Sequence, residues 1–162
     1  MKRLHLITFG FLLICFVSHG QKINSVEIYS GRGGLNNSQK ILDLSYQNLE
    51  KIPSETLNPE IETLILDNNK LTTLPSWIGQ LKNLKILSLR NNNFKELDFT
   101  INNCENLEQL YLSGNRELTD ISSISTTSKL NIIDVTDTKI NELPAGVEMM
   151  DNLFYFKYTK KD

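Results

Sequence analysis

Residues 61–84 read IETLILDNNKLTTLPSWIGQLKNL, and much of the chain repeats this stretch. Its apolar residues recur at intervals that fit neither a helix nor a strand alone: Ile61, Leu64, Leu66, Leu71, Leu74, Ile78 and Leu81. A new cycle opens at Leu84, 23 residues after Ile61. A fixed period of this length predicts an array of similar units that stack and bury one continuous core.

The first half of the stretch carries the more specific pattern. Ile61, Leu64, Leu66, Asn69 and Leu71 spell L-x-x-L-x-L-x-x-N-x-L, which resembles the leucine-rich repeat family. Six units align in register, five whole and the sixth reduced to a strand; they begin at Gln39, Ile61, Leu84, Leu107, Leu130 and Leu153. The resemblance implies an α/β leucine-rich-repeat solenoid: a right-handed coil with a parallel, concave β-sheet and an irregular, 3₁₀ or short helical convex side.

The departures between units suggest a subtype. Proline after position fourteen, in Leu74-Pro75 and Leu143-Pro144, resembles the 23-residue Ras-suppressor and Scribble class, which bacterial surface proteins share. In the fourth unit, Arg116 and Glu117 place one extra residue before Leu118, which looks like the internalin class. The next strand stays in register, so the return leg must absorb the extra residue. We expect its polar run, 122–128, to be irregular and comparatively mobile.

Residues 1–20 resemble a secretory signal peptide. Lys2 and Arg3 precede the apolar run 6–17, and small residues stand before Gln21. A membrane anchor is the alternative, but twelve residues fall short of the roughly 20 that a spanning helix needs. A lipoprotein signal at Cys15 is a weaker alternative, because Ile14 stands where such signals carry a small residue. We expect cleavage after Gly20 and a secreted, periplasmic or cell-surface protein, without membrane insertion afterwards.

Cleavage would remove both histidines and one of the two cysteines, and would change the net charge from −2 to −4. The remaining Cys104 could form no intrachain disulfide, which favours a bacterial envelope or secreted protein over an animal ectodomain. The negative charge argues against nucleic acid as a partner. Residues 21–38 are expected to form an N-terminal cap before the repeat domain at 39–162. Their Gly31-Arg32-Gly33-Gly34 run lacks the Gly-Lys-Ser/Thr of a phosphate loop.

Within each unit, period-two alternation decides which residues build the core. Leu64 and Leu66 should face inward, and Asn69, at position nine, should pair backbone groups of the turn. Cys104 takes a core position 20 residues after Leu84, as Leu81 does after Ile61, so we interpret it as a buried apolar residue. Without histidine, serine–histidine catalysis and histidine metal sites are excluded. The acidic pairs Asp134/Asp137 and Asp43/Asp67 leave a histidine-independent carboxylate hydrolase as a remote alternative. We therefore predict no enzyme activity and no cofactor or metal.

Positions three, five and seven of each unit should point away from the core. Ile65, Ile86, Tyr111 and Ile132 fall there on consecutive strands, which at about 4.8 Å per strand form a zigzag apolar stripe roughly 14 Å long. Strand propensity alone could explain such residues, but contiguous exposed apolar groups also mark binding sites. The predicted ligand-binding residues are Ile65, Asp67, Ile86, Arg90, Tyr111, Ile132, Asp134 and Tyr155.

These observations predict a protein-binding module that recognises a protein or peptide on the concave sheet. The alternative is a structural element that assembles through its C-terminal strand. Aromatic residues gather between Phe154 and Tyr158, and no return leg follows them in the sequence. Lysines nearby could oppose edge pairing by charge. We expect weak self-association through this strand.

Overall fold

The computed structural model describes residues 8–9, 12–13, 40–54, 58–124 and 129–159. The signal-peptide prediction therefore falls almost wholly outside the described residues, and the predicted cap at 21–38 falls entirely outside them. Of the first segment, β1 (Thr8–Phe9) and β2 (Leu12–Leu13) are described, and these two-residue strands pair antiparallel. Neither the cleavage site nor the cap is tested, so both stay predictions.

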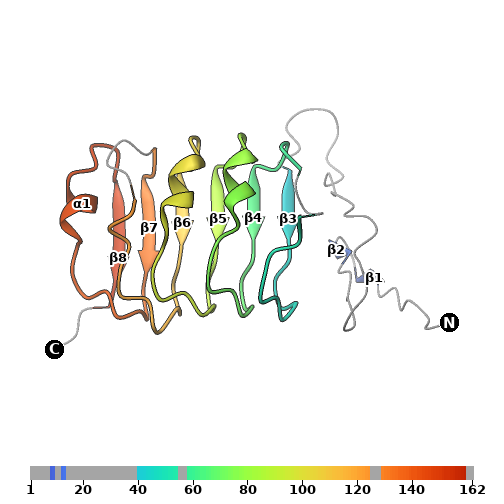
Figure 1. The fold of residues 1–162 in the computed structure, drawn as a ribbon, viewed down its shortest axis with the longest axis horizontal. Helices are drawn as coiled ribbons and strands as arrows, with labels where there is room; N and C mark the ends of the chain where they lie inside the picture. Colours follow the sequence, from blue (N-terminus) through green and yellow to red (C-terminus); the bar gives the residue numbers. More distant parts are fainter. Residues whose placement is uncertain (1–7, 10–11, 14–39, 55–57, 125–128, 160–162) are drawn as a thin grey trace.

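The repeat region forms one parallel sheet in which the strands follow chain order (Figure 1). Its strands are β3 (Ile41–Asp43), β4 (Thr63–Ile65), β5 (Ile86–Ser88), β6 (Gln109–Tyr111), β7 (Ile132–Val135) and β8 (Tyr155–Tyr158). Position four of each unit lies opposite position four of the next: Leu42, Leu64, Leu87, Leu110, Ile133 and Phe156 are in register. The predicted α/β solenoid and its alignment are confirmed.

The core lies between this sheet and the return legs. Leu64 and Leu66 are buried from the strand side, and Leu74, Ile78 and Leu81 meet them from the return leg. The convex side carries the 3₁₀ helices η2 (Ser76–Gln80) and η3 (Phe99–Asn103), and the short helix α1 (Ala145–Glu148). Pro75 and Pro144 stand directly before η2 and α1, where a fixed φ suits a helix start.

The asparagine at position nine closes the turn in the second, third and fourth units, as predicted. Asn92 donates to the carbonyl oxygens of Leu66 and Leu89 at 2.9 and 3.1 Å and accepts from the Leu71 N–H at 3.0 Å. Asn69 and Asn115 make equivalent bonds, each to its own unit and to the unit before it. Because one amide serves both donors and acceptors, buried backbone groups that the turn leaves without partners are paired.

The residue just before position nine has a left-handed backbone in five units, whether position nine is asparagine, glutamine or threonine. These residues are Tyr46, Asn68, Asn91, Gly114 and Asp137, with φ between 53° and 77°. Asparagine, aspartate and glycine tolerate that region best. A Cβ added to Gly114 would lie 2.0 Å from Asn91 Oδ1, so a larger residue there would displace the Asn91 side chain.

The fourth unit absorbs its extra residue without losing register. Arg116 and Glu117 bulge in a turn closed by the Leu118 N–H and the Asn115 carbonyl oxygen at 2.9 Å, and Leu118 still reaches the core. The return leg is one residue shorter, since Ile121 to Leu130 spans nine positions and Leu97 to Leu107 spans ten. Residues 119–124 contain turns and no helix, as expected for an irregular leg, and 125–128 lie outside the described residues.

Candidate functional site on the outer face of the sheet

The side chains at positions three, five and seven of each unit form what we call the outer sheet face. The strand register aligns these positions as the sequence predicted: Ile86 lies opposite Gln109, and Tyr111 lies opposite Asp134. The backbone bonds beyond the strands keep position seven aligned as well. All eight predicted ligand-binding residues therefore lie on this face, over β4 to β8.

The apolar stripe is present, with its members diagonal to one another. Ile65 lies opposite Ser88 rather than Ile86, which gives the expected zigzag across β4 to β7. All four members of the stripe are half-buried. The row of position three adds more exposed apolar groups at the two ends of the sheet, Ile41 at 40% and Tyr155 at 48% exposure. Apolar surface is thus concentrated along a line that crosses the whole sheet.

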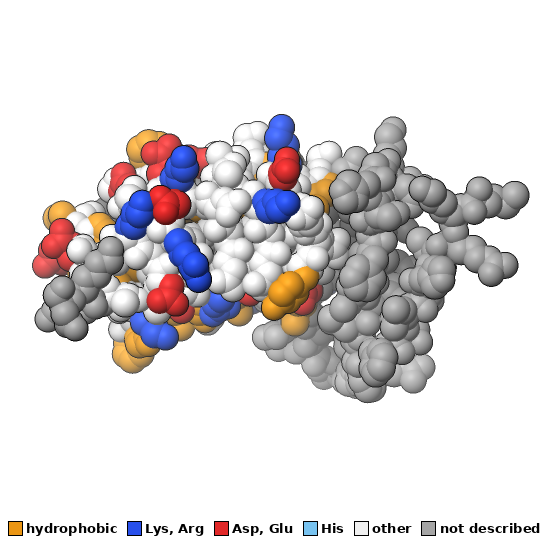
Figure 2. Space-filling view, turned by 90° about the horizontal axis from the view of Figure 1, so that it is seen from below, with side chains coloured by type: hydrophobic (Ala, Val, Ile, Leu, Met, Phe, Trp, Pro, Cys, Tyr) orange, Lys and Arg blue, Asp and Glu red, His pale blue; other side chains and the backbone are white. Residues whose placement is uncertain are grey.

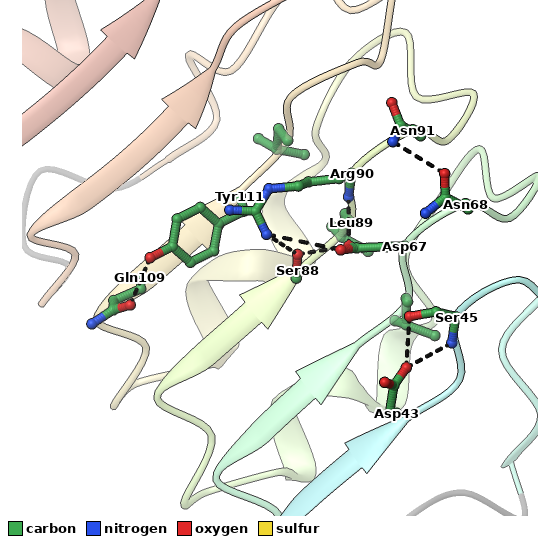
Figure 3. A network of polar contacts seen from close by, with 12 residues as sticks. Asp43, Ser45, Asp67, Asn68, Ser88, Leu89, Arg90, Asn91, Gln109 and Tyr111 are labelled. Carbon is green, nitrogen blue, oxygen red and sulfur yellow. Dashed lines mark hydrogen bonds and ion pairs between the residues drawn. The ribbon is translucent and has the colours of Figure 1, made fainter. Parts of the chain in front are cut away.

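Arg90 lies flat on the stripe rather than projecting from it (Figure 3). Its guanidinium carbon is 4.0 Å from the centre of the Tyr111 ring, which is a cation–π contact. Its Nη1 donates to Ser88 Oγ at 2.8 Å and forms a 3.8 Å ion pair with Asp67. From the sequence, Arg90 was predicted to be a hydrogen-bond donor beside the stripe. In the structure its side chain is held in place by Ser88, Asp67 and Tyr111.

Asp67 ties this arrangement to the sheet. Its Oδ1 accepts from Ser88 Oγ at 2.6 Å and from the Arg90 N–H at 2.9 Å (Figure 3). The Tyr111 hydroxyl donates to Gln109 Oε1 at 2.8 Å. A continuous chain of contacts therefore runs from Asp67 through Arg90 to the aromatic ring, and it orders the middle of the outer sheet face.

Sequence reasoning missed two members of this network. Ser88 was expected to be exposed at position five, yet it is 3% exposed because Arg90 lies across it. Gln109 had no signal of its own and acts only through its neighbour Tyr111. Thr63, also expected to face outward, is buried beside Ile41 and Ile86 on the adjacent strands. Spacing gives the direction of a side chain but not what covers it.

The remaining predicted residues lie outside this network. Asp134 accepts from the N–H and hydroxyl of Thr136, at 3.0 and 2.6 Å, and Asp43 accepts from Ser45 in the same manner. These carboxylates serve turns within their own units. Within the described ranges there is no group of three or more His, Cys, Asp or Glu side chains that could hold a metal ion.

Cys104 is buried, as its core position predicted. Burial raises the pKa of its thiol to about 11, and its Sγ lies 3.6 Å from the Ile78 carbonyl oxygen. A nucleophilic cysteine must ionise near neutral pH, so this thiol is suited to packing rather than to catalysis.

Charges at the surface are paired between neighbouring units. Lys82 and Glu105, and Lys85 and Glu62, are joined at 2.9 Å across adjacent coils. On the face shown in Figure 2, basic and acidic side chains are interspersed. On the described part of this face, neither sign of charge forms a patch of its own.

The repeat units match sequence models of a known protein family. Residues 38–94 match the model described as Leucine rich repeat, and residues 82–126 match Leucine Rich repeats (2 copies). The chain is a leucine-rich-repeat protein. Its assignment to the Ras-suppressor and Scribble class stays a prediction.

Related sequences are longer proteins that contain similar repeats. The 187-kDa microtubule-associated protein AIR9 of Arabidopsis thaliana is 36% identical over 88 residues, which are 54% of this chain and 5% of that protein. A protein phosphatase 1 regulatory inhibitor subunit homologue from the same plant is 31% identical over 132 residues, 79% of this chain and 40% of that protein. The chain thus spans well under half the length of these relatives.

Solved structures share the fold. A leucine-rich-repeat protein of Leptospira interrogans is 30% identical with a TM-score of 0.55, covering 73% of this chain and 36% of that one. Internalin C2 of Listeria monocytogenes is 25% identical with a TM-score of 0.61, covering 74% and 51%. The plant peptide hormone receptor RGFR1, solved in complex with RGF2, is 25% identical with a TM-score of 0.51, covering 62% and 17%.

Proposed function

We propose that this leucine-rich-repeat protein binds a protein or peptide ligand on its outer sheet face, outside the cytoplasm. The observation that carries the proposal is the ordered centre of that face, where Arg90 is stacked on Tyr111 and held by Asp67 within the apolar stripe. A rigid aromatic group and an arginine with apolar neighbours are the residue types that dominate protein interfaces. A surface fixed before binding also loses less conformational entropy on association.

The stripe is an anchor within a larger contact. A stable interface buries about 800 Å² per partner, more than four half-buried side chains supply. The flanking residues Asp134 and Tyr155 extend the face toward β8, and Ile65 and Asp67 extend it toward β4. A ligand that crosses the strands would contact both flanks and the centre together.

Comparisons and composition support the cellular setting and the class of function. The similarity to internalin C2 and the features of residues 1–20 favour a secreted, periplasmic or surface location. In the described ranges, no helix is long and apolar enough to cross a membrane. Binding is favoured over catalysis because the carboxylates of Asp43, Asp67 and Asp134 are engaged by neighbouring residues.

Replacing Ile86, Tyr111 and Ile132 together with serine tests the site. All three are half-buried on the outer face, so the triple variant should fold while losing the apolar stripe. Immobilised parent protein should retain a partner from the culture medium or surface extract of its source. The triple variant should retain less than about a tenth as much, and a defined complex should show the same loss in titration calorimetry.

The matched control is Phe99→Ser, which removes an aromatic side chain that is 76% exposed on the convex side. It should bind as the parent does, and circular dichroism should show the same fold in all three proteins. Equal affinity of the triple variant and the parent for a purified partner would place the ligand elsewhere on the molecule.

A further inference from the structure

Apolar side chains are exposed at the C-terminal end of the solenoid, where Phe156 and Tyr158 hold positions that the preceding units bury. Phe154 is 89% exposed and Tyr158 is 38% exposed. Phe156 is only partly buried, although Ile133, its equivalent in β7, is fully buried. In the part of the chain that the structure describes, β8 pairs with β7 alone. No other described residue therefore covers the second edge of β8 or the end of the core beneath it.

The ladder of the earlier strands identifies the backbone groups at this edge. The N–H at position six of a unit donates to the next strand at 2.8 Å, as from Leu44, Leu66, Leu89 and Leu112. Tyr158 holds position six in β8. A strand residue directs its N–H and C=O to the same side, so Phe156, two residues earlier, also faces the open edge. The carbonyl at position two accepts from the next strand at Glu62, and Phe154 holds that position in the sixth unit.

We propose that two copies of this chain pair antiparallel through β8, with Phe156 opposite the partner's Phe156. Each Phe156 then exchanges its N–H and C=O with the partner's Phe156. Each Tyr158 N–H meets the carbonyl oxygen of the partner's Phe154. The pairing joins the two sheets into one and places the two open core ends side by side.

Side-chain chemistry selects this register. On the outer face, Tyr155 of each copy lies opposite the partner's Lys157, which sets an ammonium beside an aromatic ring twice. Centring the pair on Lys157 would place it opposite the partner's Lys157, and like charges directly opposite destabilise a sheet. Centring on Tyr155 would move Tyr158 opposite the partner's Asn152, which lies outside the strand. A shift of one residue would turn the core of one copy to the wrong face.

A second copy fits this edge because the edge is complementary to itself, as a two-fold interface requires. The other arrangement of two copies is head to tail, β8 against β3, which would not close and would build filaments. With one short strand and a few aromatic groups per copy, the closed dimer should be weak and should form only at high protein concentration.

Sedimentation of the purified protein over a wide concentration range tests the proposal. We expect a monomer–dimer equilibrium. Tyr158→Pro should abolish the dimer where the parent is half dimeric, because it removes an N–H that points to the open edge and not to β7. Phe99→Ser, an equally aromatic but remote change, should dimerise as the parent does. A monomer at every concentration, open-ended oligomers, or a dimer unaffected by Tyr158→Pro would overturn it.

Disulfide trapping tests the register without relying on a proline. Tyr155→Cys and Lys157→Cys are made as separate proteins in which Cys15 is replaced by serine; the native Cys104 is buried. Mild oxidation of the mixture should yield more cross-linked dimer than either protein alone. Stronger cross-linking of Tyr155→Cys alone or Lys157→Cys alone would overturn the register.

Discussion

Asn92 shows what one side chain contributes to a stacked repeat. It pairs the Leu71 N–H and the carbonyl oxygens of Leu66 and Leu89, all buried. Asn92→Ala would leave these groups without partners, at about 1–3 kcal/mol for each buried group, so we expect a loss of roughly 3 kcal/mol in the free energy of unfolding. Urea unfolding measures it.

The neighbouring Asn93→Ala is the control for this change. The Asn93 side chain is exposed, and its backbone N–H donates to the Leu71 carbonyl oxygen. Alanine would keep this backbone hydrogen bond. It should alter stability by less than about 0.5 kcal/mol, as surface changes usually do. Similar losses for both variants would show that the buried amide is not what closes the turn.

Asn92 and Ser88 show which features of single residues can be predicted from the sequence. The role of Asn92 could be predicted, because its position recurs in the repeat and the chemistry of an amide fits a turn with unpaired donors and acceptors. The burial of Ser88 could not, because it depends on where Arg90, two residues later, directs a long side chain. The repeat leaves position seven free, so the choice between solvent and Tyr111 is made in three dimensions.

Between elements, Gly79 sets how closely η2 and η3 approach. A Cβ at Gly79 would lie 2.2 Å from the Cβ of Asn103, closer than packed atoms allow. Gly79→Ala should therefore separate the two 3₁₀ helices and cost about 1–3 kcal/mol in the free energy of unfolding. Adding Asn103→Gly should recover part of that loss, and a double-mutant cycle by chemical denaturation measures the coupling.

Gly146→Ala in α1 is the matched control. A Cβ there would meet only the Ser122 carbonyl oxygen at 3.9 Å, which is an ordinary contact. Alanine should be neutral or stabilise by about 0.5–1 kcal/mol, as expected in a helix. If the two alanine variants lose equal stability, the contact with Asn103 is not what limits the substitution at Gly79.

These contacts explain why the convex elements were harder to predict than the strands. Apolar spacing placed Ile78 and Cys104 in the core, and both are buried. It left open whether each return leg is irregular, 3₁₀ or helical, because all three can turn the same residues inward. The choice depends on packing between units, as at Gly79, and on starts such as Pro144 before α1.

At the scale of the whole molecule, each unit packs against the units next to it. Placing one position of the repeat therefore places the same position in every other unit. The 23-residue spacing was sufficient to predict that Ile65, Ile86, Tyr111 and Ile132 lie on adjacent strands, as the register shows. It could not show which of them remain free for a ligand. That depends on the path of the Arg90 side chain across the sheet.

The stacking also predicts that stability falls toward β8. The amides of Gln109 in β6 and Tyr155 in β8 make the same hydrogen bond to the preceding coil, each at 2.9 Å. Gln109 lies between two strands, whereas Tyr155 is 48% exposed at the end of the sheet. Because local opening is easier where few apolar contacts hold a strand, the Tyr155 amide should exchange with deuterium at least about tenfold faster in dilute protein. Hydrogen exchange followed by mass spectrometry or NMR measures both amides in one sample, and Gln109 is the internal control. Equal rates at the lowest concentration would mean that other parts of the chain cover β8, which would also remove the open edge required for pairing.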